Sequence, residues 1–155
     1  MVETGQKAPE FTLYDTEKNK VSLADLAGKK VLLLFFPLAF TSVCTTELCS
    51  VRDNISGYNN LQTTVFGISV DSVYTLKKFK EEQHLNFELL SDFNKEVSTA
   101  YDAIYDTFSL DMKGVSKRAA FVIDSNGILQ YKEVLASAGD VPDFDAVMRS
   151  LTLIA

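Results

Sequence analysis

Two cysteines, Cys44 and Cys49, are the residues of this chain best suited to nucleophilic chemistry. Thr41 and Ser42, which are good helix N-cap residues, predict that Cys44 lies in the first turn of a helix. Cys44 heads an apolar stripe whose other members fall within about 40° of it on a helical projection: Leu48, Val51, Ile55 and Tyr58. Free N–H groups and the helix dipole favour an anion at such a position, so Cys44 is expected to be a reactive thiolate. The alternative is an inert packing cysteine.

The expected helix follows a strand that positions it. Val31 to Phe36 form an apolar run that ends at Pro37, and a run this short predicts a strand buried on both faces. Pro37 has no backbone N–H and therefore ends the strand. A strand, a short aromatic turn and a helix thus bring the thiol to one end of a sheet.

Pro37, Thr41 and Cys44 spell P-x-x-x-T-x-x-C, which resembles the active-site signature of the peroxiredoxins. GQKAPEFTL at residues 5–13 and RAAFVIDSNGIL at residues 118–129 resemble the same family, in the same order and spacing. The resemblance implies a thioredoxin-like fold with an N-terminal extension. It also implies a thiol-dependent peroxidase for hydrogen peroxide and organic hydroperoxides, in which Pro37 shields the site, Thr41 orients the peroxide and Cys44 attacks it.

Two branches of the family share features with this chain. FFPLAFT followed by LLSDFNKEV is similar to the AhpE-type branch. A second cysteine five residues after the first is the arrangement of the PrxQ (bacterioferritin comigratory protein) branch. Both branches therefore stay open at this point.

A permanent cation is expected beside the thiolate, and Arg118 matches the family's active-site arginine. Arg52 lies about 80° from the apolar stripe and is a second candidate. Glu47, one turn after Cys44, also matches the family. A carboxylate there disfavours a thiolate by itself, so Glu47 either positions the arginine or simply complements the helix dipole.

The role of Cys49 distinguishes two possible mechanisms. In a regular helix, Cα atoms five positions apart are about 8.6 Å from each other and about 140° around the axis. A disulfide needs about 7 Å or less, so Cys44 and Cys49 cannot bond while the helix is intact. Thr45 and Thr46 are weak helix formers and lower the cost of unwinding. Resemblance to PrxQ makes Cys49 the resolving cysteine, whereas in a one-cysteine peroxidase an external thiol resolves the sulfenic acid.

Composition restricts the classes of function. The chain of 155 residues is expected to be one domain, 1–155. Its net charge of −6 argues against nucleic-acid binding, and the longest apolar run is too short to span a membrane. Two cysteines without a signal-peptide pattern indicate the cytoplasm. Two cysteines and one histidine are too few for structural zinc or an iron–sulfur cluster, so no metal or other cofactor is expected.

The partners implied by the resemblance are a peroxide and a thioredoxin- or glutaredoxin-like reductant, with the protein a monomer or a homodimer. His84, the single histidine, is expected to be solvated at a helix end, which argues against a cysteine hydrolase. A non-peroxidase thioredoxin-like redox or binding protein is the alternative from another class. The absence of C-x-x-C argues against it.

The remaining pattern predicts an α/β fold. Further strands are expected at residues 11–14, 64–70, 87–90, 119–123 and 128–134, the last two joined by an Asp124–Gly127 turn. Helices are expected from Cys44 to about Asn60, after Asp71-Ser72, within 91–103 and at 143–154. This alternation predicts a central mixed sheet with helices on both faces. Residues 104–117 are irregular, with Tyr105 assigned to the core and Phe108 to an association surface.

Overall fold

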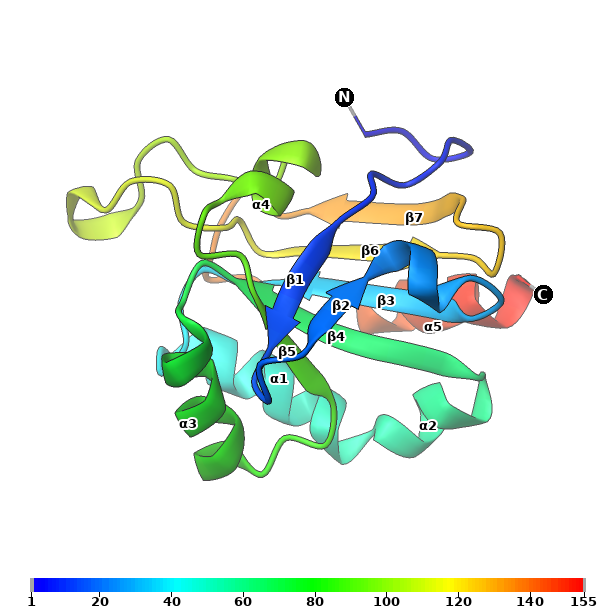
Figure 1. Cartoon of the computed structure of the whole chain (residues 1–155), viewed down its shortest axis with the longest axis horizontal. Helices are drawn as coiled ribbons and strands as arrows, with labels where there is room; N and C mark the ends of the chain where they lie inside the picture. The colour runs from blue at the N-terminus through cyan, green and yellow to red at the C-terminus, as the bar shows by residue number, and fades with distance from the viewer. Residues whose placement is uncertain (1, 155) are drawn as a thin grey trace.

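A computed structural model of the chain describes residues 2–154 and contains a seven-stranded mixed sheet in the order β2-β1-β5-β4-β3-β6-β7 (Figure 1). The strands are β1 Thr12–Asp15, β2 Lys20–Ser22, β3 Lys30–Phe35, β4 Thr63–Ser69, β5 Glu88–Ser91, β6 Ala119–Ile123 and β7 Leu129–Val134. The central strands β3, β4 and β5 run parallel, and β6 is antiparallel to β3. The predicted mixed sheet is therefore confirmed, and so is the β6–β7 hairpin.

Helices cover both faces of this sheet, as predicted. They are α1 Ser42–Asp53, α2 Ile55–Asn60, α3 Val73–Gln83, α4 Glu96–Ala100 and α5 Phe144–Leu153, with 3₁₀ turns η1 Leu23–Leu26 and η2 Ser109–Asp111. One face packs against α1, α2, α3 and α5, and the other packs against α4 and the N-terminal segment (Figure 1).

The strand β3 is the centre of the core because its side chains alternate between the two faces. Leu32 and Leu34 face the cluster that contains Cys44, whereas Leu33 and Phe35 face the opposite cluster. All four side chains are fully buried, and each contributes about 2 kcal/mol of transfer free energy. The expectation of a strand buried on both faces is confirmed.

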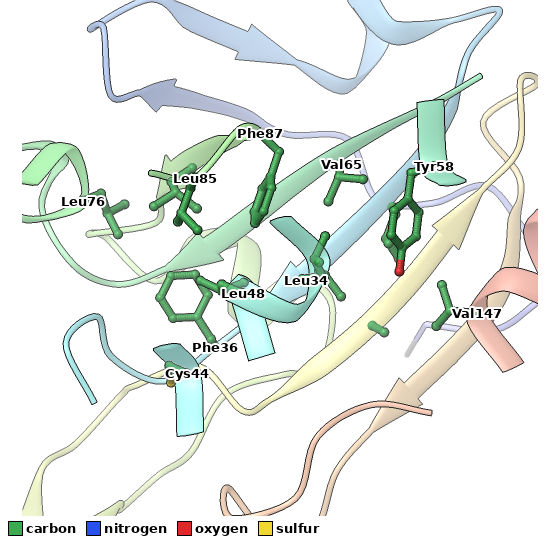
Figure 2. Packing of buried hydrophobic residues seen from close by; sticks show 14 of the residues in the cluster. Leu34, Phe36, Cys44, Leu48, Tyr58, Val65, Leu76, Leu85, Phe87 and Val147 are labelled. Atoms are coloured by element: carbon green, nitrogen blue, oxygen red, sulfur yellow. The ribbon is translucent and has the colours of Figure 1, made fainter. Parts of the chain in front are cut away.

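The apolar stripe of α1 lies against this core. Figure 2 shows Cys44 and Leu48 of α1 and Tyr58 of α2 in one cluster with Leu34 of β3 and with Phe36, the residue after β3. Gly67 of β4 makes close packing possible here, because a Cβ atom at this position would lie 2.6 Å from Leu89 Cδ2. A larger residue at this position would force the Leu89 side chain of β5 to move.

The structure corrects one predicted helix and shortens another. The helix expected to run to Asn60 is broken at Asn54, whose side-chain amide donates to the Ser50 carbonyl and ends α1. The apolar periodicity continues across this break, which is why the sequence did not reveal it. Within 91–103 only Glu96–Ala100 is helical. The Asp92 carboxylate accepts from the amides of Val97 and Ser98, so the helix begins after Asp92 and not at residue 91.

Residues 104–117 form an irregular lobe that projects from one end of the sheet (Figure 1). A bridge between Ile104 and Ser116 closes its base. Inside it, the rings of Tyr105 and Phe108 lie 5.0 Å apart, and both residues are half-buried. Tyr105 therefore packs within the lobe instead of in the main core.

Candidate active site

Cys44 lies in the first turn of α1, which follows β3 after the loop of residues 36–41, and it is completely buried. Thr41 is the N-cap residue, but its hydroxyl does not accept from the helix amides; it donates to the Leu38 carbonyl 2.8 Å away. Because no side chain caps α1, the amides of its first turn are available to stabilise negative charge beside Cys44.

The loop from Pro37 to Thr41 is held by a carboxylate from a neighbouring strand end. Asp71 Oδ2 accepts from the Ala39 amide at 2.8 Å and from the Ser69 hydroxyl at 2.7 Å. Phe40 has a left-handed backbone (φ 68°), and its ring packs on Phe79 at 5.1 Å although the residue is 48% exposed. Sequence reasoning used Asp71 only as a helix-start signal and missed its contact with this loop.

Arg118 is 2% exposed and reaches Cys44 directly. Its Nη2 donates to Cys44 Sγ at 3.2 Å and its Nη1 to Glu47 Oε1 at 2.7 Å. Nε and Nη2 also donate to the Ala138 carbonyl, at 3.2 and 3.0 Å. Burial lowers the pKa of Arg118, but the charges and hydrogen bonds of Glu47 and Cys44 outweigh burial and raise this pKa above its usual value. Arg118 is therefore a fixed, buried cation beside the sulfur.

Glu47 faces Arg118 from one turn further along α1, and its side chain is fully buried. Burial raises the pKa of Glu47 from 4.5 to about 7, and the attraction of Arg118 offsets only part of that rise. The second carboxyl oxygen, Oε2, has no hydrogen-bond partner among the described residues. The contact with Arg118 agrees with a positioning role for Glu47.

A pocket of about 220 Å³ opens beside the sulfur and has room for a small peroxide. Its walls are Pro37, Thr41, Ser42, Val43, Cys44, Phe108, Arg118, Ala138 and Gly139. Four of the predicted site residues therefore share this pocket, with Glu47 behind Arg118. The sequence did not identify Phe108 as a wall of the pocket. It also did not identify the Ala138 carbonyl as an acceptor for Arg118, because every residue type has a backbone carbonyl.

Cys49 lies apart from the pocket, on the intact part of α1. It is half-buried, and its Sγ donates to Gln83 Oε1 of α3 at 3.5 Å. Both cysteines are free thiols. Five helical positions separate their Cα atoms by about 8.6 Å, so no disulfide forms in this conformation.

The two other candidates lie outside the site. Arg52 donates to Asp53 and to the Gln83 carbonyl, so it anchors α1 on α3 and does not supply the cation. His84 is exposed at the end of α3, as expected. Residues 2–154 contain no cluster of three or more potential metal ligands. In the same residues, no helix is long and apolar enough to cross a membrane.

A buried thiol at a helix N-terminus, paired with an arginine beside a small pocket, defines a thiol oxidoreductase. Residues 4–132 match the AhpC/TSA family. A candidate peroxiredoxin of Coxiella burnetii, bcp, is 42% identical over 130 residues, which cover 83% of this chain and 85% of that protein. The chain belongs to the AhpC/TSA family: it is a peroxiredoxin, a thiol-dependent peroxidase.

Two solved structures support the same conclusion. Peroxidoxin BcpB of Mycobacterium tuberculosis superposes with a TM-score of 0.87 at 27% identity, over 100% of this chain and 99% of that one. The reduced 2-Cys peroxiredoxin of Plasmodium vivax has a TM-score of 0.87 at 30% identity, over 98% and 81%. The thioredoxin-like fold is thus confirmed, and the bcp-type relatives match the PrxQ branch of the predicted resemblance.

Proposed function

We propose that this peroxiredoxin reduces hydrogen peroxide and organic hydroperoxides through Cys44. The thiolate attacks one peroxide oxygen, the O–O bond breaks, and the other oxygen leaves as hydroxide or alkoxide and takes up a proton. Cys44 becomes a sulfenic acid. The observation that carries this proposal is the 3.2 Å contact from Arg118 Nη2 to Cys44 Sγ at the wall of the pocket.

In this proposal the surrounding residues align and stabilise the reacting atoms. Arg118 has further N–H groups with which to reach the peroxide, so one planar cation holds both sulfur and oxygen. The Thr41 hydroxyl orients the peroxide, and the amides of the first turn of α1 stabilise the leaving oxygen. Pro37 is buried and carries no N–H, so it shields the sulfur from water without competing for the peroxide.

Resolution by Cys49 is the second part of the proposal. The Cys49 thiol displaces water from the Cys44 sulfenic acid and gives an intramolecular disulfide, after the first turns of α1 unwind. Two contacts support easy unwinding: the hydroxyls of Thr45 and Thr46 donate to the carbonyls of Thr41 and Ser42, a bonding pattern that weakens a helix. A thioredoxin- or glutaredoxin-like dithiol then reduces the disulfide.

A one-cysteine cycle is the competing mechanism. The bond from Cys49 to Gln83 favours it, because Cys49 must leave this partner before it can reach Cys44. An external thiol would then resolve the sulfenic acid. Both cycles fit a cytoplasmic location, because both need reduced thiols to regenerate Cys44, and the cytoplasm maintains them. The protein acts as a monomer or a homodimer.

Steady-state peroxide consumption with a thioredoxin system separates the two cycles. Wild type is expected to turn over, and Cys44→Ser is expected to be inactive. Cys49→Ser is expected to lose turnover with thioredoxin but to recover it with a small thiol. Full turnover of Cys49→Ser with thioredoxin would reject Cys49 as the resolving residue, and an active Cys44→Ser would reject the proposed function.

A further inference from the structure

The carboxyl group of Glu47 is buried in an unusual way. Its side chain is fully inaccessible, and only Oε1 has a partner, Arg118 Nη1 at 2.7 Å. Oε2 has none among the described residues. An ionised carboxylate with one desolvated, unpartnered oxygen is costly, whereas a neutral acid with its proton on Oε2 is much less so.

The net charge of the group around Arg118 determines when the Glu47 carboxyl ionises. Cys44 and Glu47 are two buried acids that share this one cation, with contacts of 3.2 and 2.7 Å. If both acids were ionised, the buried group would carry one net negative charge, but it is neutral if only one is. A negative charge on either acid therefore disfavours a negative charge on the other.

Two other charged side chains on the adjoining elements, Arg52 and Glu133, are engaged elsewhere. Arg52 of α1 pairs with Asp53 and the Gln83 carbonyl. Glu133 of β7 accepts from the Tyr131 hydroxyl and the Asp143 amide. Among the described residues, Arg118 is the charged group that shifts the pKa of Glu47. Cys44 can influence Glu47 through this arginine, because both residues contact it.

We propose that Glu47 keeps its proton while Cys44 is a thiolate and releases it when Cys44 is oxidised, so that Arg118 always faces one negative charge. This inference rests on the proposed function of Cys44. The thiolate and a hydroperoxide give the sulfenic acid and an alkoxide, which takes up one proton to become the alcohol. Glu47 gives up one proton in the same step, so the reaction draws no net proton from the solvent. Glu47 does not touch the peroxide and acts as a positioning residue through Arg118.

The first test follows the Glu47 carboxyl by NMR in protein labelled with ¹³C at glutamate, with Glu47→Gln to assign the signal. In Cys44→Ser, where burial and Arg118 act on Glu47 without a competing thiolate, we expect a midpoint near a pKa of about 7. In the reduced wild type the thiolate competes for Arg118, so the midpoint should lie higher by about one pH unit or more. A midpoint that is the same in both proteins would overturn the inference, because burial alone would then explain the shift.

A second test counts protons in weakly buffered solution with an indicator dye, at a pH just below the Glu47 midpoint. Cys49→Ser is oxidised with one equivalent of hydrogen peroxide, and its mass confirms that Cys44 gained one oxygen. About half a pH unit below that midpoint, Glu47 is about three-quarters protonated before oxidation and about one-quarter protonated after it, so we expect uptake of about half a proton per molecule in this variant and about one when Glu47→Gln is added. Equal uptake in both would overturn the inference. A failure of Cys44 to gain oxygen would instead reject the proposed function, and the comparison of wild type with Cys44→Ser would still decide the inference.

Discussion

Arg118 Nη2 lies 3.2 Å from Cys44 Sγ although the two residues are 74 positions apart in the sequence. The sheet creates this contact. β6 runs antiparallel to β3 with Ala119 opposite Phe35, so the residue just before β6 lies beside the strand end that leads to the Pro37 loop. The register of two central strands thus sets the distance between cation and sulfur.

Arg118→Lys should lower the rate of Cys44 oxidation by about 100-fold although it keeps the positive charge. An ammonium group is a point charge and cannot contact sulfur, Glu47 and the Ala138 carbonyl together. Stopped-flow oxidation by hydrogen peroxide measures this rate. Arg149→Lys, an exposed arginine on α5, is the matched control and should react like the wild type. Wild-type kinetics in Arg118→Lys would show that the fork geometry is not needed.

Thr45→Ala together with Thr46→Ala should slow formation of the Cys44–Cys49 disulfide about five-fold. Removing the hydroxyls that bond back to Thr41 and Ser42 strengthens the helix by about 1 kcal/mol, which must be overcome before Cys49 can reach Cys44. Rapid-quench thiol counting after one equivalent of peroxide measures the step.

The matched control for this pair is Thr152→Ala on α5, where the hydroxyl makes the same kind of bond to the Met148 carbonyl. It should leave the disulfide rate unchanged. Oxidation of Cys44 itself should be nearly unaffected in the double variant. A disulfide rate equal to that of wild type would mean that unwinding of the first turns of α1 does not limit resolution.

Phe108→Ala should reduce the preference for bulky organic hydroperoxides over hydrogen peroxide. Phe108 is an apolar wall of the pocket, and losing its contact with an alkyl chain should cost about 1 to 2 kcal/mol, or roughly 5- to 30-fold in relative kcat/KM. Leu110→Ala is the control, because Leu110 belongs to the same lobe but is 91% exposed and outside the pocket. An unchanged ratio of the two kcat/KM values would remove Phe108 from the specificity of the site.

Glu47 should make the reduced protein less stable as the pH rises. Burial raises its folded pKa from 4.5 to about 7, before any effect of a charge on Cys44, so its contribution to stability is full below pH 4.5 and is lost as the pH rises to about 7 and above. The free energy of unfolding of wild type, relative to Glu47→Gln, should fall by up to about 3 kcal/mol over this window. Urea unfolding of both proteins at a series of pH values measures it. A difference that stays constant, or grows with pH, would contradict the buried-acid description.

The local part of the site could be predicted from the sequence because Pro37, Thr41 and Cys44 lie within one strand–loop–helix unit. The apolar run of β3 and the stripe of α1 identify that unit without knowledge of the rest of the chain. Arg118 could be selected only through resemblance to a family. Its own position before a strand has the pattern of an ordinary surface arginine, and only the pairing of β6 with β3 brings it to the sulfur.

Other parts of the site depend on tertiary contacts that leave no pattern. The Ala138 carbonyl that holds Arg118 is a backbone atom, and any residue type offers the same acceptor. The sequence around Asp71 indicates only the start of a helix, although Asp71 Oδ2 also accepts a hydrogen bond from the Ala39 amide. The break at Asn54 is hidden because the apolar period of α1 continues into α2.

Whether Cys44 attacks the peroxide is tested most directly by the mass of Cys49→Ser after one equivalent of hydrogen peroxide, with the modified residue located by fragmentation. We expect a single added oxygen on Cys44, formed rapidly, and no such addition in the double variant Cys44→Ser with Cys49→Ser. In the wild type the same treatment should give a loss of two hydrogens, corresponding to the Cys44–Cys49 disulfide. An unmodified Cys44, or oxygen added elsewhere at the same rate in the double variant, would contradict the assignment of Cys44 as the residue that attacks the peroxide.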